Sequence, residues 1–336
     1  MKTDKILLDH GSGGKISNQM ISDIMLPIFN NPMLSKLNDG AVFTVSGNRL
    51  AFSTDTYTVD PVFFPGGNIG SLSINGTVND IAMCGAVPLY LSAGLIIEEG
   101  FPFTDLREIL EKMGQAARTA GVQVVTGDTK VVPKGSADKI FINTSGIGVI
   151  PDGVNISGDR ARPGDKVLLS GAIADHGIAI LTKRKGMSFD LPVESDTAPL
   201  NFMVERMLAA CKDLHVLRDP TRGGVGISLN EIAFKSKVGI RIVENKIPIK
   251  PEIAGTCELL GLDPLYIANE GKLLAIVPSD KADKVLEAIK NGPYGKDAAM
   301  IGEVVPDHPG MVVLETLIGG SRIIDMLTGE QLPRIC

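Results

Sequence analysis

NGTVNDIAMCGAVP, at residues 75–88, combines a helical pattern with an unusual polar face. Asn75 and Asn79 are four residues apart and therefore lie on the same side of a helix, with Asp80 beside them. Gly76 and Ala82 leave the backbone open to close approach by another group. Because asparagine and glycine are poor helix formers, a polar face built from them needs a reason. Two reasons are left open at this point: tight packing at an interface and contact with a ligand.

Strand patterns flank this helix in the first half of the chain. Residues 49–53, 90–97 and 122–126 are predicted strands, and residues 71–84 are a predicted helix. The clearest helix is predicted for residues 104–120, where one apolar stripe runs along the segment, Thr104 can cap the start and Gly121 can end it. Alternating strands and helices predict an α/β layer.

A cluster of turn formers after Ile150 marks a domain boundary. Beyond it a strand is predicted at residues 166–170, helices at about 198–211, 225–237 and 281–289, and a strand at 272–277. We therefore expect an N-terminal α/β domain over residues 1–153 and a C-terminal α+β domain over residues 154–327. Residues 328–336 are short and polar, so we expect a loosely held, mobile tail that carries Cys336.

Composition excludes several classes of protein. A chain of 336 residues with 44% apolar residues can bury one large core or two medium ones. With 33 basic and 39 acidic residues it has no surplus of positive charge for a nucleic-acid backbone. The start of the chain lacks the apolar stretch of a signal peptide, and no apolar run reaches the length of a membrane helix. Four widely spaced cysteines suit a reducing compartment, so we expect a cytoplasmic protein.

Acidic residues stand next to glycine, threonine or asparagine at four predicted strand or helix ends. They are Asp39, Asp55, Asp80 and Asp128. Carboxylates at such positions suit Mg²⁺, a hard cation that takes oxygen ligands beside substrate phosphates. Each one alone is more often a solvated turn or cap residue. Their joint presence in one half of the chain favours a magnesium site.

Three further segments suit phosphate or proton chemistry. Gly11, Ser12, Gly13 and Gly14 can offer backbone N–H groups to a phosphate, or can simply form a flexible turn. Arg222, in the segment at residues 219–224 before a predicted helix, offers a guanidinium, with a structural ion pair as its alternative role. Glu270 precedes a predicted strand and is either a functional carboxylate or a turn residue.

These segments, in this order, resemble the superfamily of aminoimidazole ribonucleotide synthetase, selenophosphate synthetase and thiamine-monophosphate kinase. The match covers essentially the whole chain and rests on residues 11–14, 39–41, 53–56, 75–88, 127–132, 219–224 and 269–272. Within the superfamily, residues 8–14, residues 60–70 and the ending Pro333-Arg334-Ile335-Cys336 are similar to the HypE family of hydrogenase maturation proteins. One departure is Asn38, which stands where an acidic residue often precedes Asp39.

The resemblance implies a two-domain fold in which N-terminal strands pair with a second copy in a homodimer, with ATP and Mg²⁺ as cofactors. It implies that the carbamoyltransferase HypF loads a carbamoyl group onto Cys336 and that the HypC–HypD complex receives the product. ATP would phosphorylate the carbamoyl oxygen, which is otherwise a poor leaving group, and loss of phosphate would leave a thiocyanate.

The candidate residues fall into three sets. The catalytic candidates are Cys336, Lys130, Glu270, His10 and Arg222; the nucleotide-binding candidates are Gly11, Ser12, Gly13, Gly14, Asp55, Asn75, Asn79, Asp80, Asp128 and Thr129; the metal candidates are Asp39, Asp55, Asp80 and Asp128. Two alternatives stay open. A small-molecule kinase or ligase of the same superfamily would not need Cys336, and a non-enzymatic thiol carrier or scaffold would not need ATP turnover.

Overall fold

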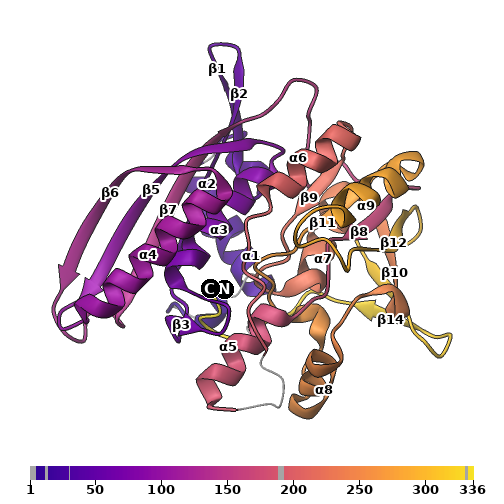
Figure 1. Ribbon diagram of the computed structural model, residues 1–336. Coiled ribbons are helices and arrows are strands. Elements are labelled where there is room, and N and C mark those ends of the chain that lie inside the picture. Colours follow the sequence, from indigo (N-terminus) through magenta and orange to yellow (C-terminus); the bar gives the residue numbers. More distant parts are fainter. Residues whose placement is uncertain (1–4, 12–13, 30, 188–192, 330–331) are drawn as a thin grey trace.

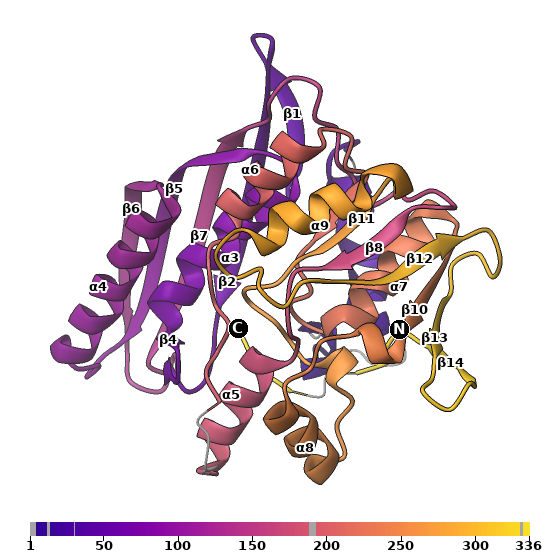
Figure 2. The ribbon, with the colours of Figure 1, turned by 45° about the vertical axis from the view of Figure 1, so that its right-hand side comes forward.

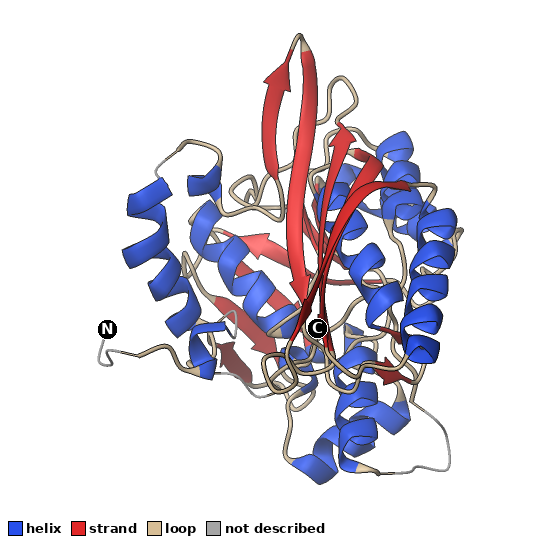
Figure 3. Ribbon diagram, turned by 90° about the vertical axis from the view of Figure 1, so that its left-hand side faces the viewer, coloured by secondary structure: helices blue, strands red, loops and turns tan. Residues whose placement is uncertain are grey.

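The computed structural model describes residues 5–11, 14–29, 31–187, 193–329 and 332–336. It contains two large sheets with helices packed between and around them (Figure 1). The first sheet has the order β1-β2-β7-β5-β6, from β1 (Ala41–Val45), β2 (Asn48–Tyr57), β5 (Val87–Glu98), β6 (Gln123–Val132) and β7 (Ile140–Val149). All its neighbours are antiparallel except β5 and β6. The β1–β2 hairpin extends beyond the rest of the sheet (Figure 3).

Helices α3 (Ile69–Met83) and α4 (Phe103–Ala120) pack against each other and against one face of this sheet (Figure 2). A reciprocal cap begins α3: the side chain of Asn68 accepts hydrogen bonds from Gly70 N and Ser71 N at 2.9 and 3.2 Å, and Ser71 Oγ accepts one from Asn68 N at 3.1 Å. Gly121 ends α4 with a positive φ of 72°, as predicted. The prediction for Thr104 was wrong, because α4 begins one residue earlier and its N-cap is Pro102.

The second sheet has the order β14-β13-β10-β12-β8-β11-β9. Its strands are β8 (Lys166–Leu169), β9 (Val216–Arg218), β10 (Gly239–Val243), β11 (Leu274–Val277), β12 (Ala299–Val305), β13 (Val312–Glu315) and β14 (Ser321–Ile324). Its helices are α5 (Asp175–Lys185), α6 (Asn201–Ala210), α7 (Gly224–Ser236), α8 (Pro251–Leu260) and α9 (Ala282–Lys290). This mixture of elements confirms the expected combination of α/β and α+β parts.

Short elements make the remaining connections. Before the first sheet lie η1 (Leu8–Gly11), α1 (Lys15–Met20), the π-helical segment η2 (Ile21–Met25), α2 (Leu26–Phe29) and η3 (Leu34–Lys36). A small ribbon of β3 (Phe63–Phe64) and β4 (Gly67–Asn68) precedes α3, and η4 (Glu244–Lys246), η5 (Pro264–Tyr266) and η6 (Ser279–Lys281) lie in the second half. Within the described residues, no helix is both long enough and apolar enough to span a membrane.

Alternating side chains along the central strands β8 and β11 divide the hydrophobic core into two clusters. Leu168 of β8 and Ala275 of β11 join a cluster that contains α6, α9, α3 and α4, whereas the next residues, Leu169 and Leu274, join a second cluster around α7. This follows from the period of two in a strand, which sends neighbouring side chains to opposite faces. The larger cluster is therefore continuous between the two sheets and fixes the position of one half of the chain against the other.

Gly76 generates a prediction about stability. A Cβ at this position of α3 would lie 2.2 Å from the hydroxyl oxygen of Tyr57, a side chain that is only 1% exposed. We expect Gly76→Ala to lower the free energy of unfolding by about 1–3 kcal/mol, because the buried ring must shift. Gly114→Ala in α4 is the matched control, since its nearest neighbour is the flexible end of Arg118 at 3.4 Å. The control should be neutral or stabilising by up to about 1 kcal/mol. Urea unfolding measures both changes, and equal effects would contradict the packing argument.

Candidate active site

Three carboxylates meet where the two halves of the chain join. Asp39 precedes β1, Asp80 is near the end of α3 and Asp219 directly follows β9. One oxygen of each lies within 4.8 Å of the others. Ser53 of β2 holds two members of the cluster, because its hydroxyl is 2.7 Å from Asp80 Oδ2 and 2.9 Å from the carbonyl oxygen of Asp39.

The electrostatics of this acidic cluster are unfavourable without a cation. Burial, followed by the charges of Asp219, Asp55 and Asp39, raises the pKa of Asp80 well above its ordinary value. Burial and then Asp39 raise the pKa of Asp219 to about 7, although Arg218 opposes this. Each carboxylate is both desolvated and close to like charges, the two conditions that disfavour ionisation.

The donor set fits Mg²⁺. Three carboxylates supply hard oxygen ligands, and a Mg²⁺ ion bound to them keeps coordination positions for water or substrate phosphate. Asp219 was not among the predicted metal ligands, although its segment had been singled out for phosphate binding. The available signal was its place immediately after a strand, which it shares with other members of the predicted acidic set.

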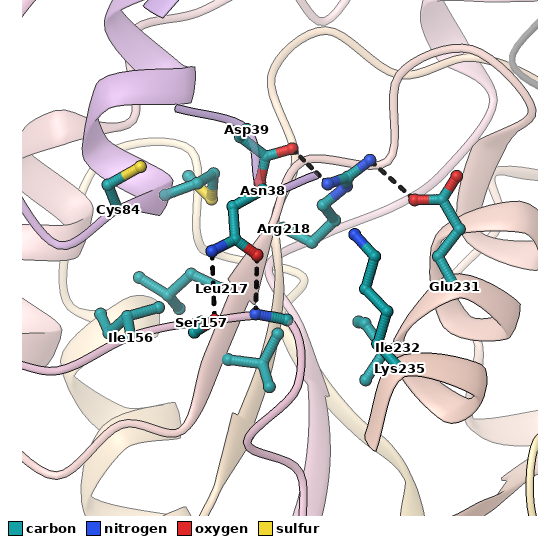
Figure 4. A pocket seen from close by; sticks show the side chains of 13 residues that line it. Asn38, Asp39, Cys84, Ile156, Ser157, Leu217, Arg218, Glu231, Ile232 and Lys235 are labelled. Atoms are coloured by element: carbon teal, nitrogen blue, oxygen red, sulfur yellow. Dashed lines mark hydrogen bonds and ion pairs between the residues drawn. The ribbon is translucent and has the colours of Figure 1, made fainter. Parts of the chain in front are cut away.

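Charged side chains from β9 and α7 lie next to Asp39 of the acidic cluster (Figure 4). Arg218 Nη1 is 2.6 Å from Asp39 Oδ1, and Arg218 Nη2 is 2.8 Å from Glu231 Oε2. Lys235, one turn further along α7, donates to the carbonyl oxygen of Leu37. The cavity beside these residues measures about 10 Å³, which is room for no more than one water molecule. Arg218, Glu231 and Lys235 therefore hold Asp39 in place, and the sequence pattern did not reveal them.

Asn38 has a structural role. Its side-chain nitrogen donates to Ser157 Oγ at 3.1 Å, and its side-chain oxygen accepts from Gly158 N at 3.1 Å. Both partners lie in the segment between β7 and β8 that joins the two sheets. An amide that donates and accepts at once suits this position, so the departure from an acidic residue is explained by the contacts of Asn38.

Glu270 lies beside the acidic cluster and is 3% exposed. Its Oε1 atom is buried and has no hydrogen-bond partner among the described residues. Burial, then Asp55 and Asp219, raise the pKa of Glu270 well above its ordinary value, so the structure brings Asp55 and Glu270 into the field of the same cluster. A buried carboxyl with an unpaired oxygen and a raised pKa is suited to proton transfer.

The polar face of α3 contacts a crossing segment, residues 193–200. Asn79 donates to the carbonyl oxygens of Ala198 and Glu270 at 3.1 and 3.3 Å and accepts from Leu200 N at 2.8 Å. These contacts join the amide of Asn79 to main-chain groups, so interface packing accounts for this residue, and its predicted nucleotide contact stays a prediction. Asn75 differs, because its nitrogen binds Thr197 Oγ1 at 3.2 Å while its buried oxygen lacks a partner among the described residues.

Two segments predicted to contact phosphate lie against each other. Arg222 Nη1 donates to the carbonyl oxygen of Gly11 at 2.7 Å. Gly14 is buried just before α1, whereas Ser12 and Gly13 lie outside the described residues. Gly224 begins α7 with a φ of 61°, and a Cβ there would lie 2.6 Å from the carbonyl oxygen of Leu265. His10 is buried, and its Nδ1 lies 3.0 Å from the backbone N of Leu7, the residue just before η1.

Asp128, Thr129 and Lys130 lie apart from the acidic cluster, on the edge strand β6 (Figure 1). Lys130 Nζ is 2.8 Å from Asp128 Oδ2, and both side chains are 69% exposed. Within one chain the structure therefore does not bring Asp128 to the other predicted ligands. An edge strand faces solvent or a partner, and strand periodicity alone does not distinguish it from an interior strand.

The C-terminal residues are docked. Ile335 is 3% exposed and packs in the large core cluster, with Cys336 half-buried beside it. A terminal carboxylate oxygen of Cys336 accepts from Thr58 N at 2.9 Å, just past the end of β2, the strand that carries Asp55. This arrangement differs from the loosely held tail expected from the polar sequence, because the apolar side chain of Ile335 finds a buried site that only the folded chain provides.

Comparison with known proteins agrees with the fold. The family model described as AIR synthase related protein, N-terminal domain, matches residues 37–150, and the corresponding C-terminal domain model matches residues 162–314. The carbamoyl dehydratase HypE of Azotobacter vinelandii is 51% identical over 336 residues, which cover 100% of this chain and 98% of that protein.

Two solved structures are also similar. The crystal structure of a HypE–HypF complex contains a chain with a TM-score of 0.88 and 49% identity, covering 92% of this chain and 99% of that one. HypE in complex with ATP has a TM-score of 0.84 and 52% identity, covering 99% of this chain and 100% of that one.

Removing one charge from the acidic cluster should stabilise the chain in the absence of metal. We expect Asp219→Asn to raise the melting temperature in EDTA at pH 8, because it relieves repulsion among the three carboxylates. Mg²⁺ should raise the melting temperature of the native chain, and Asp219→Asn should abolish this rise. The raised pKa of about 7 means that folding binds a proton between about pH 4 and pH 7, so the gain should shrink as pH falls from 8 to 5. Differential scanning fluorimetry measures the melting temperature in EDTA, with Mg²⁺ and at each pH. Asp213→Asn, at a carboxylate that is 71% exposed, is the control; an equal response from the control would contradict the metal assignment.

Proposed function

Because the chain belongs to the HypE family of carbamoyl dehydratases, we propose that it uses ATP to convert a carbamoyl group on Cys336 into a cyano group during maturation of [NiFe] hydrogenase. One observation carries the assignment to Cys336. The chain binds its own terminal cysteine at the end of β2, and the same strand carries Asp55 next to the acidic cluster and Glu270. A small-molecule kinase has no use for a terminal thiol held there.

The reaction balances with ATP as the second substrate. The carbamoyl oxygen of the thioester on Cys336 attacks the terminal phosphorus of ATP, and ADP leaves. The carbon–oxygen bond then breaks as phosphate departs, and the two nitrogen-bound protons are removed to leave S–C≡N. The products are the thiocyanate, ADP, hydrogen phosphate and one proton, so the oxygen lost from the amide leaves within the phosphate.

Glu270 is the proposed proton acceptor. Its burial raises its pKa, which makes the ionised carboxylate a stronger base, and its unpaired Oε1 leaves one oxygen available to an N–H group. Arg222 and the backbone of Gly11 and Gly14 are proposed to contact phosphate, with Asn75 as a further nucleotide contact. Lys130 and His10 stay as predicted proton-handling residues, and their described contacts support no specific step.

Asp39, Asp80 and Asp219 are proposed to hold Mg²⁺, with Asp55 close by. The ion would supply positive charge against the triphosphate. Asp219 takes the place that sequence analysis gave to Asp128, since Asp128 and Thr129 lie on β6.

The free edge of the first sheet supports a homodimer. Nine of the ten residues of β6 are exposed, among them Val124, Val125 and Val131 at 43%, 57% and 68%. An uncovered edge strand with apolar side chains is a template for pairing with another chain. In the proposed dimer, β6 and the adjoining face of the first sheet in one copy contact the same surface of a second copy. This contact would bring Asp128, Thr129 and Lys130 next to a partner chain.

Further parts of the proposal rest on resemblance. HypF is the proposed source of the carbamoyl group, supported by the solved complex of a related HypE with HypF. HypC–HypD is the proposed acceptor of the cyano group. We also propose that the protein works in the cytoplasm, with residues 1–153 as the ATP-binding and dimerising unit, residues 154–327 as the second domain and residues 328–336 as a tail that undocks for loading. The tail can reach about 30 Å when extended.

Intact-mass measurement tests the activity. After incubation with HypF, carbamoyl phosphate and ATP, we expect a carbamoyl group on Cys336 that loses one water when Mg-ATP is supplied, and no modification of Cys336→Ala. Glu270→Gln should be loaded normally but should lose water at least about 100-fold more slowly, in line with removal of a general base. Glu258→Gln, at an exposed position on α8, is the matched control and should behave as the native chain. ATP consumption without tail modification would support a small-molecule kinase, and loading without water loss would support a thiol carrier.

A charged residue at the free edge tests the dimer. We expect Val125→Lys to convert the dimer to a monomer in sedimentation velocity, because it places a cation in an apolar contact. Ile318→Lys is the control, since Ile318 is 96% exposed in the loop between β13 and β14, far along the chain from β6. A monomeric native chain, or a dimer that survives Val125→Lys, would overturn the proposed interface.

A further inference from the structure

The main-chain oxygens of the last four residues, three carbonyls and the terminal carboxylate, all accept hydrogen bonds. Pro333 O and Arg334 O accept from Arg184 Nη1 and Nη2, each at 2.8 Å. Ile335 O lies 2.7 Å from His176 Nε2, and Cys336 O accepts from Thr58 N at 2.9 Å. Three consecutive carbonyls and the terminal carboxylate bound in this way form a built peptide-binding site, and its ligand is the tail itself.

Side chains of the tail add contacts that fix its register. Arg334 Nε donates to the carbonyl oxygen of Thr58 at 2.8 Å, and its guanidinium pairs with Asp138 and lies 6.0 Å from the ring centre of Phe141. Asp60 N donates to Arg334 O at 3.2 Å, so residues 334–336 run antiparallel to residues 58–60. A shift of one residue would move Ile335 out of its buried position and break this pairing.

The two side-chain donors come from one helix, α5. His176 is fully buried in the first turn of the helix, and Arg184 lies near its end. Arg184 Nε also donates to Asp60 O at 2.7 Å, so one guanidinium connects α5, the segment after β2 and the tail. Such a planar fork of donors has a fixed geometry that holds several carbonyls in one arrangement, whereas the donors of a lysine ammonium rotate on a flexible stem.

The ring of His176 is oriented by a second contact. His176 Nδ1 lies 2.7 Å from Ser195 Oγ, which itself accepts from Thr197 N at 3.1 Å. Because the carbonyl oxygen of Ile335 can only accept, the ring proton is assigned to Nε2, and in the neutral ring Nδ1 accepts from the hydroxyl of Ser195. Burial lowers the pKa of His176, in keeping with a neutral ring.

We propose that Arg184 and His176 are positioning residues that form a latch on the tail, and that this latch sets how often Cys336 is available to a loading enzyme. The tail cannot occupy this site and the active site of another protein at the same time, because its last four main-chain acceptors are already bound here. Docking therefore competes with loading and favours the later, ATP-dependent step. This inference rests on the proposed function for its role in the reaction, although the latch itself is a property of the docked tail.

The first test measures how often the tail undocks. Carboxypeptidase removes Cys336 only from an undocked tail, and such cleavage follows the population of the open form when opening and closing are fast. We expect Arg184→Met in the full-length chain to release Cys336 at least about tenfold faster, because it removes two hydrogen bonds from a charged group. Arg184→Lys should be intermediate. Lys185→Met removes the same charge from the next, exposed position of α5 and should match the native chain.

The second test separates the latch from general stability. With HypF and carbamoyl phosphate, Arg184→Met should be loaded at least as fast as the native chain, whereas its single-turnover loss of water with Mg-ATP should be slower. A merely structural role would affect both steps and would also reduce the thermal stabilisation by Mg-ATP, which we expect to be unchanged.

The outcomes distinguish the latch from the proposed function. Equal release of Cys336 from Arg184→Met and Lys185→Met would overturn the latch. If the native chain never loses water with ATP, the proposed function fails, while the comparison of carboxypeptidase rates still decides whether the latch exists.

Discussion

Three closely spaced carboxylates that repel one another are the constraint on which this structure depends, one of them buried and two partly buried. Asp39, Asp80 and Asp219 come from a loop, a helix and a strand end that are distant in sequence, and their oxygens lie within 4.8 Å. Burying like charges is unfavourable unless a cation compensates them. Arg218 supplies part of that compensation to Asp39, and the remaining charge is what makes the cluster able to bind a metal ion.

The polar face of α3 shows how the site and the domain interface are built together. Asp80 reaches the acidic cluster, while Asn79, one position earlier, fixes the crossing segment at residues 193–200 and the carbonyl oxygen of Glu270. Glu270 also has its backbone N–H bound by Asp196, which forms a buried pair with Lys272 at 2.9 Å. A single helix turn thus aligns a metal candidate with the proposed base across the junction of the two halves.

The same crossing segment connects the site with the tail. Ser195 orients His176, His176 binds Ile335, and Thr197 contacts Asn75 of α3. The position of the tail is therefore coupled by direct hydrogen bonds to the helix that carries Asp80. Such a chain of contacts gives a physical route by which docking of Cys336 and arrangement of the catalytic groups can depend on each other.

Sequence alone determined the elements with strong local signals: strands β2, β5 and β6 of the first sheet, helix α4 with its glycine end, and the family motifs that contain Asp39, Asp80, Arg222 and Glu270. Strands β1 and β7 were not predicted. Local pattern was less successful at element ends, since Thr104 does not cap α4. Local sequence pattern also could not show which strands and side chains lie next to each other in the folded chain. Periodicity does not reveal that β6 is an edge strand, so Asp128 was grouped with ligands from which the single chain separates it.

Only the tertiary structure decided which acids share a site, that Asn79 serves the interface, and that the polar-looking tail has a binding site. The physical reason is the same in each case. Asp219, Arg218, His176 and Arg184 act through contacts with residues far away in the chain, and the free energy of those contacts depends on burial and distance, which the order of residues does not contain.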